Sequence, residues 1–345
     1  MPLRLLKIEN WRNYQNFQLE LSPKVNFIYG RNGSGKSNLI EAIFFGLFFK
    51  SYRAKKEEEL VFWKKGFFRL NLDFFQEKIE KTEVFFSPSV KQVKIDGVKI
   101  PLLKALGKTT GVLFIPEMLG IIAGRPAERR RFLDLILLQT NNKYPYLLVE
   151  FQKILRQRNA LLESIKNKKA DSGQLDVWDE NFLTVSRQII KLRQGLVDFL
   201  SSKLNDIYRQ ISHHQEIIKI GYQPSDLEKF SPHRQRDIIL GFTEIGPHRD
   251  DVGFFINGHQ FVAAGSRGEI RTLVLALKVL ELEYLRQVGA SQPILLLDDV
   301  FSELDRSRRD FLRPIVKQYQ AVVTSVENEE WKGVEKINLG DRIKI

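Results

Sequence analysis

The sequence predicts an α/β protein with a strand-rich flank, interrupted by an inserted antiparallel helical arm. Two observations predict this class. Strand-like alternation occupies both ends of the chain, whereas the stretch from about residue 127 to 210 has helical spacing and almost no glycine. We therefore expect segments 1–125 and 221–345 to be two halves of one domain, and segment 126–220 to be the arm.

The first segment alternates between apolar and polar residues from its start, as half-buried strands do. The expected elements are strands at 3–8, 17–21 and 25–29, a glycine-rich turn at 30–35 and a helix at 36–48. Short strand-like pieces then recur from residue 60 to 100, with Asp96-Gly97 as a hairpin turn. This part of the chain is therefore the strand-rich flank.

The arm carries two apolar stripes with steps of three and four residues. One follows Pro145, a residue typical of helix starts, and the other runs from 178 to 199. A polar link at 167–173 separates them, so we expect two antiparallel helices. After residue 243 the expected elements are strands at 254–256 and 260–262, a helix at 268–286 and an apolar strand at 294–297.

Composition narrows the function classes. The chain has 345 residues, no cysteine and a formal charge of +12. Disulfides and thiolate metal sites are excluded, which fits a reducing compartment. The sequence has neither the apolar core of a signal peptide nor an apolar run long enough to cross a bilayer, so we do not expect a membrane protein. The basic excess either attracts nucleic acid or only keeps the protein soluble.

Residues 30–37 match the phosphate-loop pattern G-x-x-x-x-G-K-[ST], between a predicted strand and a predicted helix. The glycines let backbone amides face phosphates, Lys36 reaches the β and γ oxygens, and the Ser37 hydroxyl ligates Mg²⁺. This motif predicts ATP and Mg²⁺ as cofactors. The predicted nucleotide contacts here are Gly30, Arg31, Asn32, Gly33, Ser34, Gly35, Lys36, Ser37 and Asn38.

The apolar strand at 294–297 ends in Asp298 and Asp299. A carboxylate there can share Mg²⁺ with Ser37, which we assign to Asp298. Asp299 is then placed to orient or deprotonate the attacking water. The predicted catalytic residues are Lys36, Asp298 and Asp299. The alternative, a plain strand end, is weakened by the phosphate loop upstream.

A second phosphate-seeking element precedes the helix expected at 268–286. Ser266 and Glu269 have the spacing of a capping box, while the small residues and free amides of a helix start also suit an anion. Both interpretations stay open from these residues alone.

Three short motifs resemble those of ABC-type ATPases: Ser266-x-Gly268, then Asp298-Asp299, then residues 302–305, S-E-L-D. The resemblance implies that Ser266 and Gly268 contact the γ-phosphate held by another copy of the chain. An ATP-dependent, head-to-tail homodimer would follow. It also implies nucleotide-site roles for Asp305 and Arg12, within an ABC-type P-loop ATPase lobe.

Further segments resemble the RecF family along nearly the whole chain. They are N-W-R-N-Y at 10–14, the phosphate loop, S-Y-R at 51–53, G-R-P-A-E-R-R-R-F-L-D at 124–134, Q-R-N-A-L-L at 157–162, G-P-H-R-D-D at 246–251 and D-D-V-F-S-E-L-D at 298–305. Two departures occur. Residues 266–271 read S-R-G-E-I-R where the family has S-Q-G-Q-Q-R. No switch histidine follows the strand at 321–325, where Thr324 is a candidate sensor of the γ-phosphate.

Membership of that family implies a cytoplasmic, ATP-dependent DNA-binding protein of recombinational repair and replication restart. The resemblance implies an ATP-gated dimer on single-stranded, gapped and double-stranded DNA, with a slow, DNA-stimulated ATPase as its switch. It also implies RecO and RecR as partners in recombinase loading. The alternatives are a nucleotide-binding subunit of an ABC transporter and a short chromosome protein of the SMC type. The basic arm opposes the former, and the arm's shortness opposes the latter.

Basic residues form two candidate DNA-binding sets, although for each single residue the role of a solvated surface charge is favoured. The first set lies on the arm and consists of Arg125, Arg129, Arg130, Arg131, Lys153, Arg156 and Arg158. The second set lies on the N-terminal lobe and consists of Lys55, Lys56, Lys64 and Lys65. In the G-P-H-R-D-D turn, His248 and Arg249 either bind DNA or form a salt-bridged corner with Asp250 and Asp251.

Overall fold

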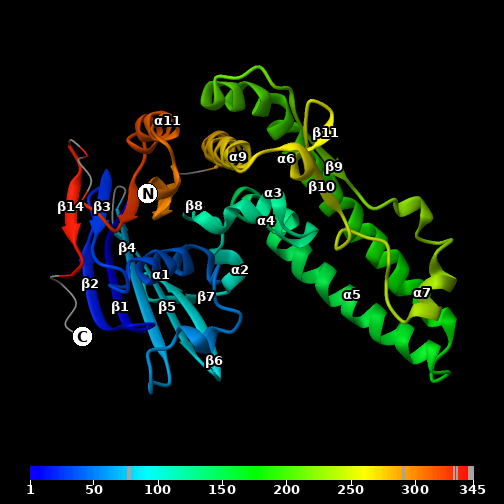
Figure 1. Cartoon of the computed structure of the whole chain (residues 1–345). Helices are drawn as coiled ribbons and strands as arrows, with labels where there is room; N and C mark the ends of the chain where they lie inside the picture. The colour runs from blue at the N-terminus through cyan, green and yellow to red at the C-terminus, as the bar shows by residue number, and fades with distance from the viewer. Residues whose placement is uncertain (76–78, 290–291, 329–330, 332, 341–345) are drawn as a thin grey trace. The chain divides into compact units, whose positions relative to one another are not determined.

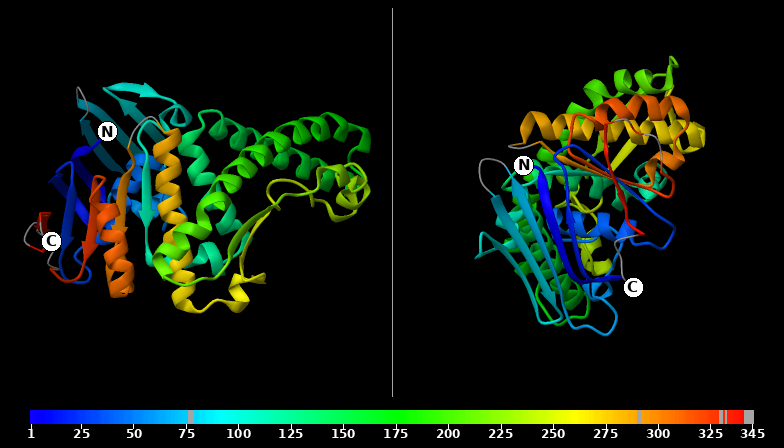
Figure 2. Two further views of the ribbon diagram at one scale, coloured as in Figure 1. Left: turned by 90° about the horizontal axis from the view of Figure 1, so that it is seen from above. Right: turned by 90° about the vertical axis from the view of Figure 1, so that its left-hand side faces the viewer.

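The computed structural model describes residues 1–75, 79–289, 292–328, 331 and 333–340. The chain forms two compact units, 1–118 with 281–345, and 119–280 (Figures 1 and 2). Residues 221–280 group with the helical arm, whereas the sequence suggested that they belong with the C-terminal half. The two ends of the chain share one unit.

A five-stranded sheet brings the two ends of the chain together in the first unit. Its order is β14-β3-β13-β12-β8, and its neighbouring strands are parallel. The strands are β3 Val25–Tyr29, β8 Gly111–Phe114, β12 Ile294–Asp298, β13 Ala321–Ser325 and β14 Glu335–Asn338. Every residue of β12 and β13 is buried, which explains their unbroken apolar runs. Parallel pairing places the carboxyl ends of β3 and β12 at the same edge.

A second, antiparallel sheet in this unit has the order β2-β1-β4-β5-β6-β7. Its strands are β1 Leu3–Trp11, β2 Tyr14–Glu20, β4 Phe68–Phe75, β5 Ile79–Ser87, β6 Val90–Ile95 and β7 Val98–Ile100. Alternate residues of β4, from Phe68 to Phe74, are buried on one face. The turn predicted at Asp96-Gly97 joins β6 to β7, with both residues at positive φ. The strand-rich flank is thus a real sheet.

Helix α1 Lys36–Phe48 contacts strands of both sheets, among them β12 and β4. A helix enclosed in this way is apolar on nearly every side, and most of α1 is buried. A Cβ atom at Gly46 would lie 2.5 Å from the side chain of Leu72, so a larger residue would require Leu72 to move. The remaining helices of the unit are η1 Glu57–Leu60, α2 Leu102–Ala105, α10 Val300–Glu303 and α11 Arg306–Val316.

The second unit contains the predicted pair of helices, α5 Tyr144–Lys166 and α6 Leu175–Ser212, joined by a short polar link. They pack on each other through the apolar stripes, with Phe151 against Phe182. The other elements are α3 Gly120–Ala123, α4 Pro126–Thr140, η3 Ser172–Gln174, β9 Ile218–Gln223, η4 Leu227–Lys229, α7 Arg234–Leu240, β10 Asp251–Ile256, β11 His259–Gln260 and α8 Phe261–Ala264. The 3-10 helix η2 Pro116–Leu119 and helix α9 Arg267–Val288 lie at the unit boundaries.

The strand predicted at 260–262 is wrong beyond Gln260. Strand β11 stops there, and Phe261 begins the short helix α8. The side chain of Phe261 is fully buried and packs edge-on against Tyr208 of α6. Burying this ring takes precedence over the alternating pattern that suggested a longer hairpin.

Buried ion pairs tie the arm together. The Arg158 side chain is 0% exposed and donates to Asp179 at 2.7 Å, to Asp237 at 2.8 Å and to Thr243 at 2.7 Å. Enclosed in this way, Arg158 is not part of a DNA-facing surface. Charges buried in protein need such partners, since an unpaired one would be costly.

The G-P-H-R-D-D turn forms a salt-bridged corner, but its two acids pair with arginines of α4 and α6, whereas the sequence suggested His248 and Arg249 as their partners. Asp251 accepts two hydrogen bonds from Arg129, at 2.7 and 3.0 Å. Asp250 is buried and pairs with Arg193 at 3.1 Å. These contacts fasten the turn to α4 and α6.

His248 gives this corner a pH dependence. Its Nε2 lies 3.0 Å from the Thr243 carbonyl. Burial lowers the pKa of His248 to about 4, and the charges of Arg249 and Arg130 act in the same direction while Asp250 opposes them. A histidine in an unfolded chain titrates near pH 6.5. The unfolded chain therefore binds the extra proton, and stability falls as the pH is lowered from about 6.5 toward 4.

We expect the second unit to lose about 2 kcal/mol of unfolding free energy from this group between pH 7.5 and pH 5. Urea denaturation at the two pH values measures the loss. A His248→Gln variant should lack that share of the pH dependence, whereas His259→Gln, at an exposed site, should retain it. Equal dependence in His248→Gln and the unmodified chain would contradict the assignment.

Candidate phosphate-binding site

The glycine-rich loop joins the end of β3 to the start of α1. Gly33 and Gly35 have φ of 80° and 93°, which side chains rarely adopt. A Cβ atom at Gly35 would lie 2.7 Å from Asn13 and 2.8 Å from the Tyr14 hydroxyl, so only glycine fits there. The hydroxyl of Ser34 is buried and has no hydrogen-bond partner among the described residues. The loop therefore has the conformation and the free donor that a phosphate requires.

Lys36 is the first residue of α1, and only 7% of it is exposed. Its ammonium donates to the carbonyl oxygens of Gly30 at 2.6 Å and of Arg31 at 3.0 Å. Burial lowers the pKa of Lys36, while the nearby charges of Asp299 and Asp298 raise it. The structure thus holds the lysine across its own loop, next to both acids.

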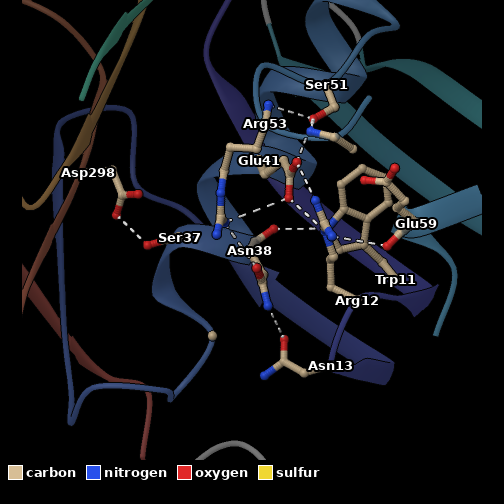
Figure 3. Close-up of polar contacts among 12 residues, drawn as sticks. Trp11, Arg12, Asn13, Ser37, Asn38, Glu41, Ser51, Arg53, Glu59 and Asp298 are labelled. Carbon is tan, nitrogen blue, oxygen red and sulfur yellow. Dashed lines mark hydrogen bonds and ion pairs between the residues drawn. The ribbon is translucent and has the colours of Figure 1, made fainter. Parts of the chain in front are cut away.

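Ser37 and Asp298 meet across 261 positions of sequence. The Ser37 hydroxyl donates to Asp298 Oδ1 at 3.1 Å, and the Thr324 hydroxyl donates to the same oxygen at 2.7 Å (Figure 3 shows the Ser37 contact). Burial raises the pKa of Asp298, and these two hydrogen bonds oppose the rise. Parallel pairing of β3, β13 and β12 produces this meeting, because all three strands end at one edge.

Asp299 has a strained backbone. Its φ of 52° and ψ of 26° lie in the left-handed region, which costs energy for residues other than glycine and is often found at functional sites. The amide of Asp299 is fixed by the Thr324 hydroxyl at 3.1 Å. Its Oδ1 atom is buried with no hydrogen-bond partner among the described residues. A carboxylate oxygen left without a donor is available to accept a proton or to orient a water molecule.

Arg12 lies beside the loop helix but is engaged by the chain itself. It donates to both oxygens of Glu41, each at 2.9 Å, and to the Glu59 carbonyl at 3.0 Å (Figure 3). Glu41 is fully buried in α1 and also accepts a hydrogen bond from Ser51 at 2.5 Å. In this structure Arg12 therefore braces the loop helix against β1.

Arg53 and Asn38 form a polar edge beside this brace. Arg53 donates to the Asn38 side chain at 3.3 Å and lies 3.9 Å from Glu41. Its charge opposes the rise that burial causes in the pKa of Asp298. Asn38 donates in turn to Asn13 at 2.8 Å. The Arg53 side chain is 46% exposed and only loosely held. Arg53 is thus a cation near Asp298, and the sequence analysis gave this arginine no role.

Ser266 and Gly268 lie at the start of α9 in the second unit. The Ser266 amide donates to Glu269 at 2.6 Å, and the Glu269 amide donates to the Ser266 hydroxyl at 3.3 Å. This is the capping box that the spacing allowed, and it turns the Glu269 carboxylate back onto the helix start. Asp305, in the first unit, caps α11 by accepting from the Arg308 amide at 3.0 Å.

The basic candidates differ in how they are placed. Arg129 pairs with Asp251, and Arg130 donates to the Asp250 carbonyl at 2.6 Å, so both are engaged by the corner. The remaining candidates are exposed: Arg125, Arg131, Lys153, Arg156, Lys55 and Lys56. The structure therefore separates two corner-forming arginines from an outward-facing set.

The chain is similar in sequence to proteins of one known family. Residues 2–339 match the family described as the RecF/RecN/SMC N terminal domain. A DNA replication and repair protein RecF from Lachnoclostridium phytofermentans is 37% identical over 341 residues, covering 96% of this chain and 94% of that protein. The chain belongs to the RecF family. The RecF protein of Desulfitobacterium hafniense is 36% identical over 348 residues, with the same coverage.

Solved structures agree with the RecF assignment. The recombination mediator protein RecF with ATP, from the RecFOR pathway, has a TM-score of 0.90 and 30% identity, covering 98% of this chain and 96% of that one. An SMC head bound to the C-winged helix domain of ScpA has a TM-score of 0.55 at 15% identity, which shows a shared fold. The predicted RecF resemblance and ABC-type fold are confirmed.

None of the helices in the described part of the chain has the length and the apolar character that a membrane span needs.

Sequence reasoning gave no role to Glu41, although a signal for it existed. A lone carboxylate stands in the middle of the apolar helix 36–48, and a buried acid implies a buried partner.

Thr324, which the sequence suggested only as a candidate sensor, is hydrogen-bonded to both Asp298 and Asp299. No local pattern could have shown that contact, because it joins two strands that are neighbours only in the sheet.

Proposed function

We propose that this RecF-family chain is an ATP-dependent DNA-binding protein of recombinational repair and replication restart. The observation that carries the proposal is the grouping of Lys36, Ser37, Asp298 and Asp299 at the ends of β3 and β12. The RecF relatives are named for DNA replication and repair, and one RecF structure was solved with ATP. The transporter alternative has no support from these relatives.

ATP fits the site in two respects. The Ser34 hydroxyl and Asp299 Oδ1 are buried without partners, and Lys36 can exchange its bonds to the loop carbonyls for bonds to the β and γ oxygens. Ser37 and Asp298 supply two hard oxygen ligands at one point, as Mg²⁺ requires. Mg²⁺ bound there would neutralise phosphate charge. In the described part of the chain, no three His, Cys, Asp or Glu side chains are grouped so that they could hold a metal ion without other ligands.

ATP hydrolysis is slow in this proposal, and its role is to switch the dimer from a closed to an open state. Asp299 orients and deprotonates water, while Lys36 stabilises charge that develops on the transferred phosphoryl group. Ser266 and Gly268 of a second copy close over the γ-phosphate, with Asp305 and Arg12 at the rim of the site. The homodimer thus holds DNA while ATP is intact and opens after hydrolysis.

The proposed partners are single- and double-stranded DNA, RecO and RecR. The exposed basic candidates, Arg125, Arg131, Lys153, Arg156, Lys55 and Lys56, are the DNA contacts that we propose. The net charge of +12 favours phosphate binding through counterion release. Support for RecO and RecR comes from the RecFOR pathway named for the RecF-ATP structure.

Binding to gapped, single-stranded and duplex DNA, each with ATP and with ADP, tests this function. We expect ATP to give tighter binding than ADP and to double the mass of the protein in solution. DNA should also raise the rate of ATP turnover. Equal affinity in the two nucleotide states would leave a constitutive basic protein and refute the switch.

A further inference from the structure

The side chain of Trp63 is 79% exposed. An indole ring is large and mostly apolar, so leaving it in water forgoes a sizeable favourable burial energy. The other tryptophans are at least half-buried: Trp11 is 0% and Trp331 5% exposed, and Trp178 is intermediate. An isolated, exposed tryptophan on a basic protein is therefore a candidate contact for a flat partner.

The turn that carries Trp63 is fastened to the first unit. The amide of Phe62 donates to the Asn10 carbonyl at 2.8 Å, and the amide of Lys65 donates to the Phe62 carbonyl at 3.0 Å. Val61 forms a β-bridge with Trp11. The ring is thus presented from a fixed backbone, which reduces the entropy lost when it binds.

The same turn is joined to the loop helix. Arg12 donates from its amide to the Leu60 carbonyl at 2.7 Å and from its guanidinium to the Glu59 carbonyl, while holding Glu41 of α1 (Figure 3). The segment that displays Trp63 and the helix that begins at Lys36 therefore share one brace.

Charge on this segment favours an anion. Lys55, Lys56, Lys64 and Lys65 are exposed, and none of them pairs with a carboxylate of the described residues. Of the intervening acids, Glu57 is engaged by Lys91, and the Glu59 side chain accepts from the Lys56 amide at 3.3 Å. Glu58 alone faces solvent with no such contact. Exposed cations on the same segment as an exposed aromatic ring suit a nucleobase with its phosphates.

We propose that segment 55–66 is a binding platform for single-stranded DNA, on which Trp63 stacks against a base and the four lysines bind the flanking phosphates. Single-stranded DNA fits better than duplex DNA, because only unpaired bases expose a face to a ring on a surface turn. The platform deepens the proposed function and rests on it, since it gives one strand of gapped DNA a defined place on the chain.

Binding of the full-length protein to oligothymidylate and to duplex DNA tests the platform. We expect Trp63→Ala to lower oligothymidylate affinity about 5- to 100-fold, the range for loss of one stacked base. Duplex affinity should change less than about twofold, since no stacking is lost there. Val98→Ala, at another exposed apolar residue of the unit (65% exposed), is the control and should bind as the unmodified chain does.

Tryptophan fluorescence gives a second readout. Stacking on thymine should quench the emission of Trp63, and Trp63→Phe should lose that quenching while binding oligothymidylate within about threefold of the unmodified chain. Unchanged oligothymidylate binding by Trp63→Ala, or full quenching in Trp63→Phe, would overturn the platform alone. Failure of the unmodified chain to bind any DNA would overturn the proposed function as well.

Discussion

A Lys36→Arg variant is expected to remain monomeric with ATP and to lose at least about 100-fold of its ATP turnover. The Lys36 ammonium is nearly enclosed by the loop, 2.6 and 3.0 Å from two backbone carbonyls. A planar guanidinium of greater width does not fit that space, although its charge is the same. Light scattering with ATP measures the mass, and phosphate release measures the rate.

Lys50→Arg is the matched control for this variant. Lys50 is exposed just beyond the end of α1, so the same substitution there should leave mass and turnover unchanged. Thermal unfolding without nucleotide should also be similar for all three proteins, which separates loss of binding from loss of fold. Normal ATP-dependent dimerisation by Lys36→Arg would refute the gating role of this loop.

An Asp299→Asn variant should behave in the opposite way, forming a dimer with ATP that does not dissociate. Loss of a general base lowers turnover about 10²- to 10⁴-fold. Asparagine has the same shape as aspartate and tolerates the left-handed backbone that residue 299 adopts, at φ 52°. It should therefore preserve the fold and the phosphate contacts while removing the basic oxygen.

Dimer lifetime after dilution into ADP measures this trap. Asp310→Asn, an exposed acid on α11 whose ion pairs are on the surface, is the control and should dissociate normally. A variant Asp299→Asn that hydrolyses ATP at the usual rate would remove Asp299 from the chemistry. One that cannot dimerise would place its role in nucleotide binding instead.

For two arginines of the arm, the sequence indicates burial but not the partners that burial requires. The sequence suggests Arg158 as a DNA contact or a surface charge, yet it lies four residues after Ile154 and four before Leu162, on the buried stripe of α5. Arg193 follows Ile189 on α6 in the same manner. The helical period thus gave a signal that these two are buried. It could not name their partners, which lie 21 to 85 positions away in sequence.

By itself, the sequence determined the α/β class, the phosphate loop, the acidic pair after β12 and the RecF family, because each depends on residues that are close together or on a regular period. Only the tertiary structure decided that Thr324 bonds Asp298, that Arg12 braces Glu41, and that Arg129 serves the corner. Pairing of this kind depends on which strands and helices become neighbours. Periodicity shows which side of an element is buried, whereas the fold alone chooses what that side meets.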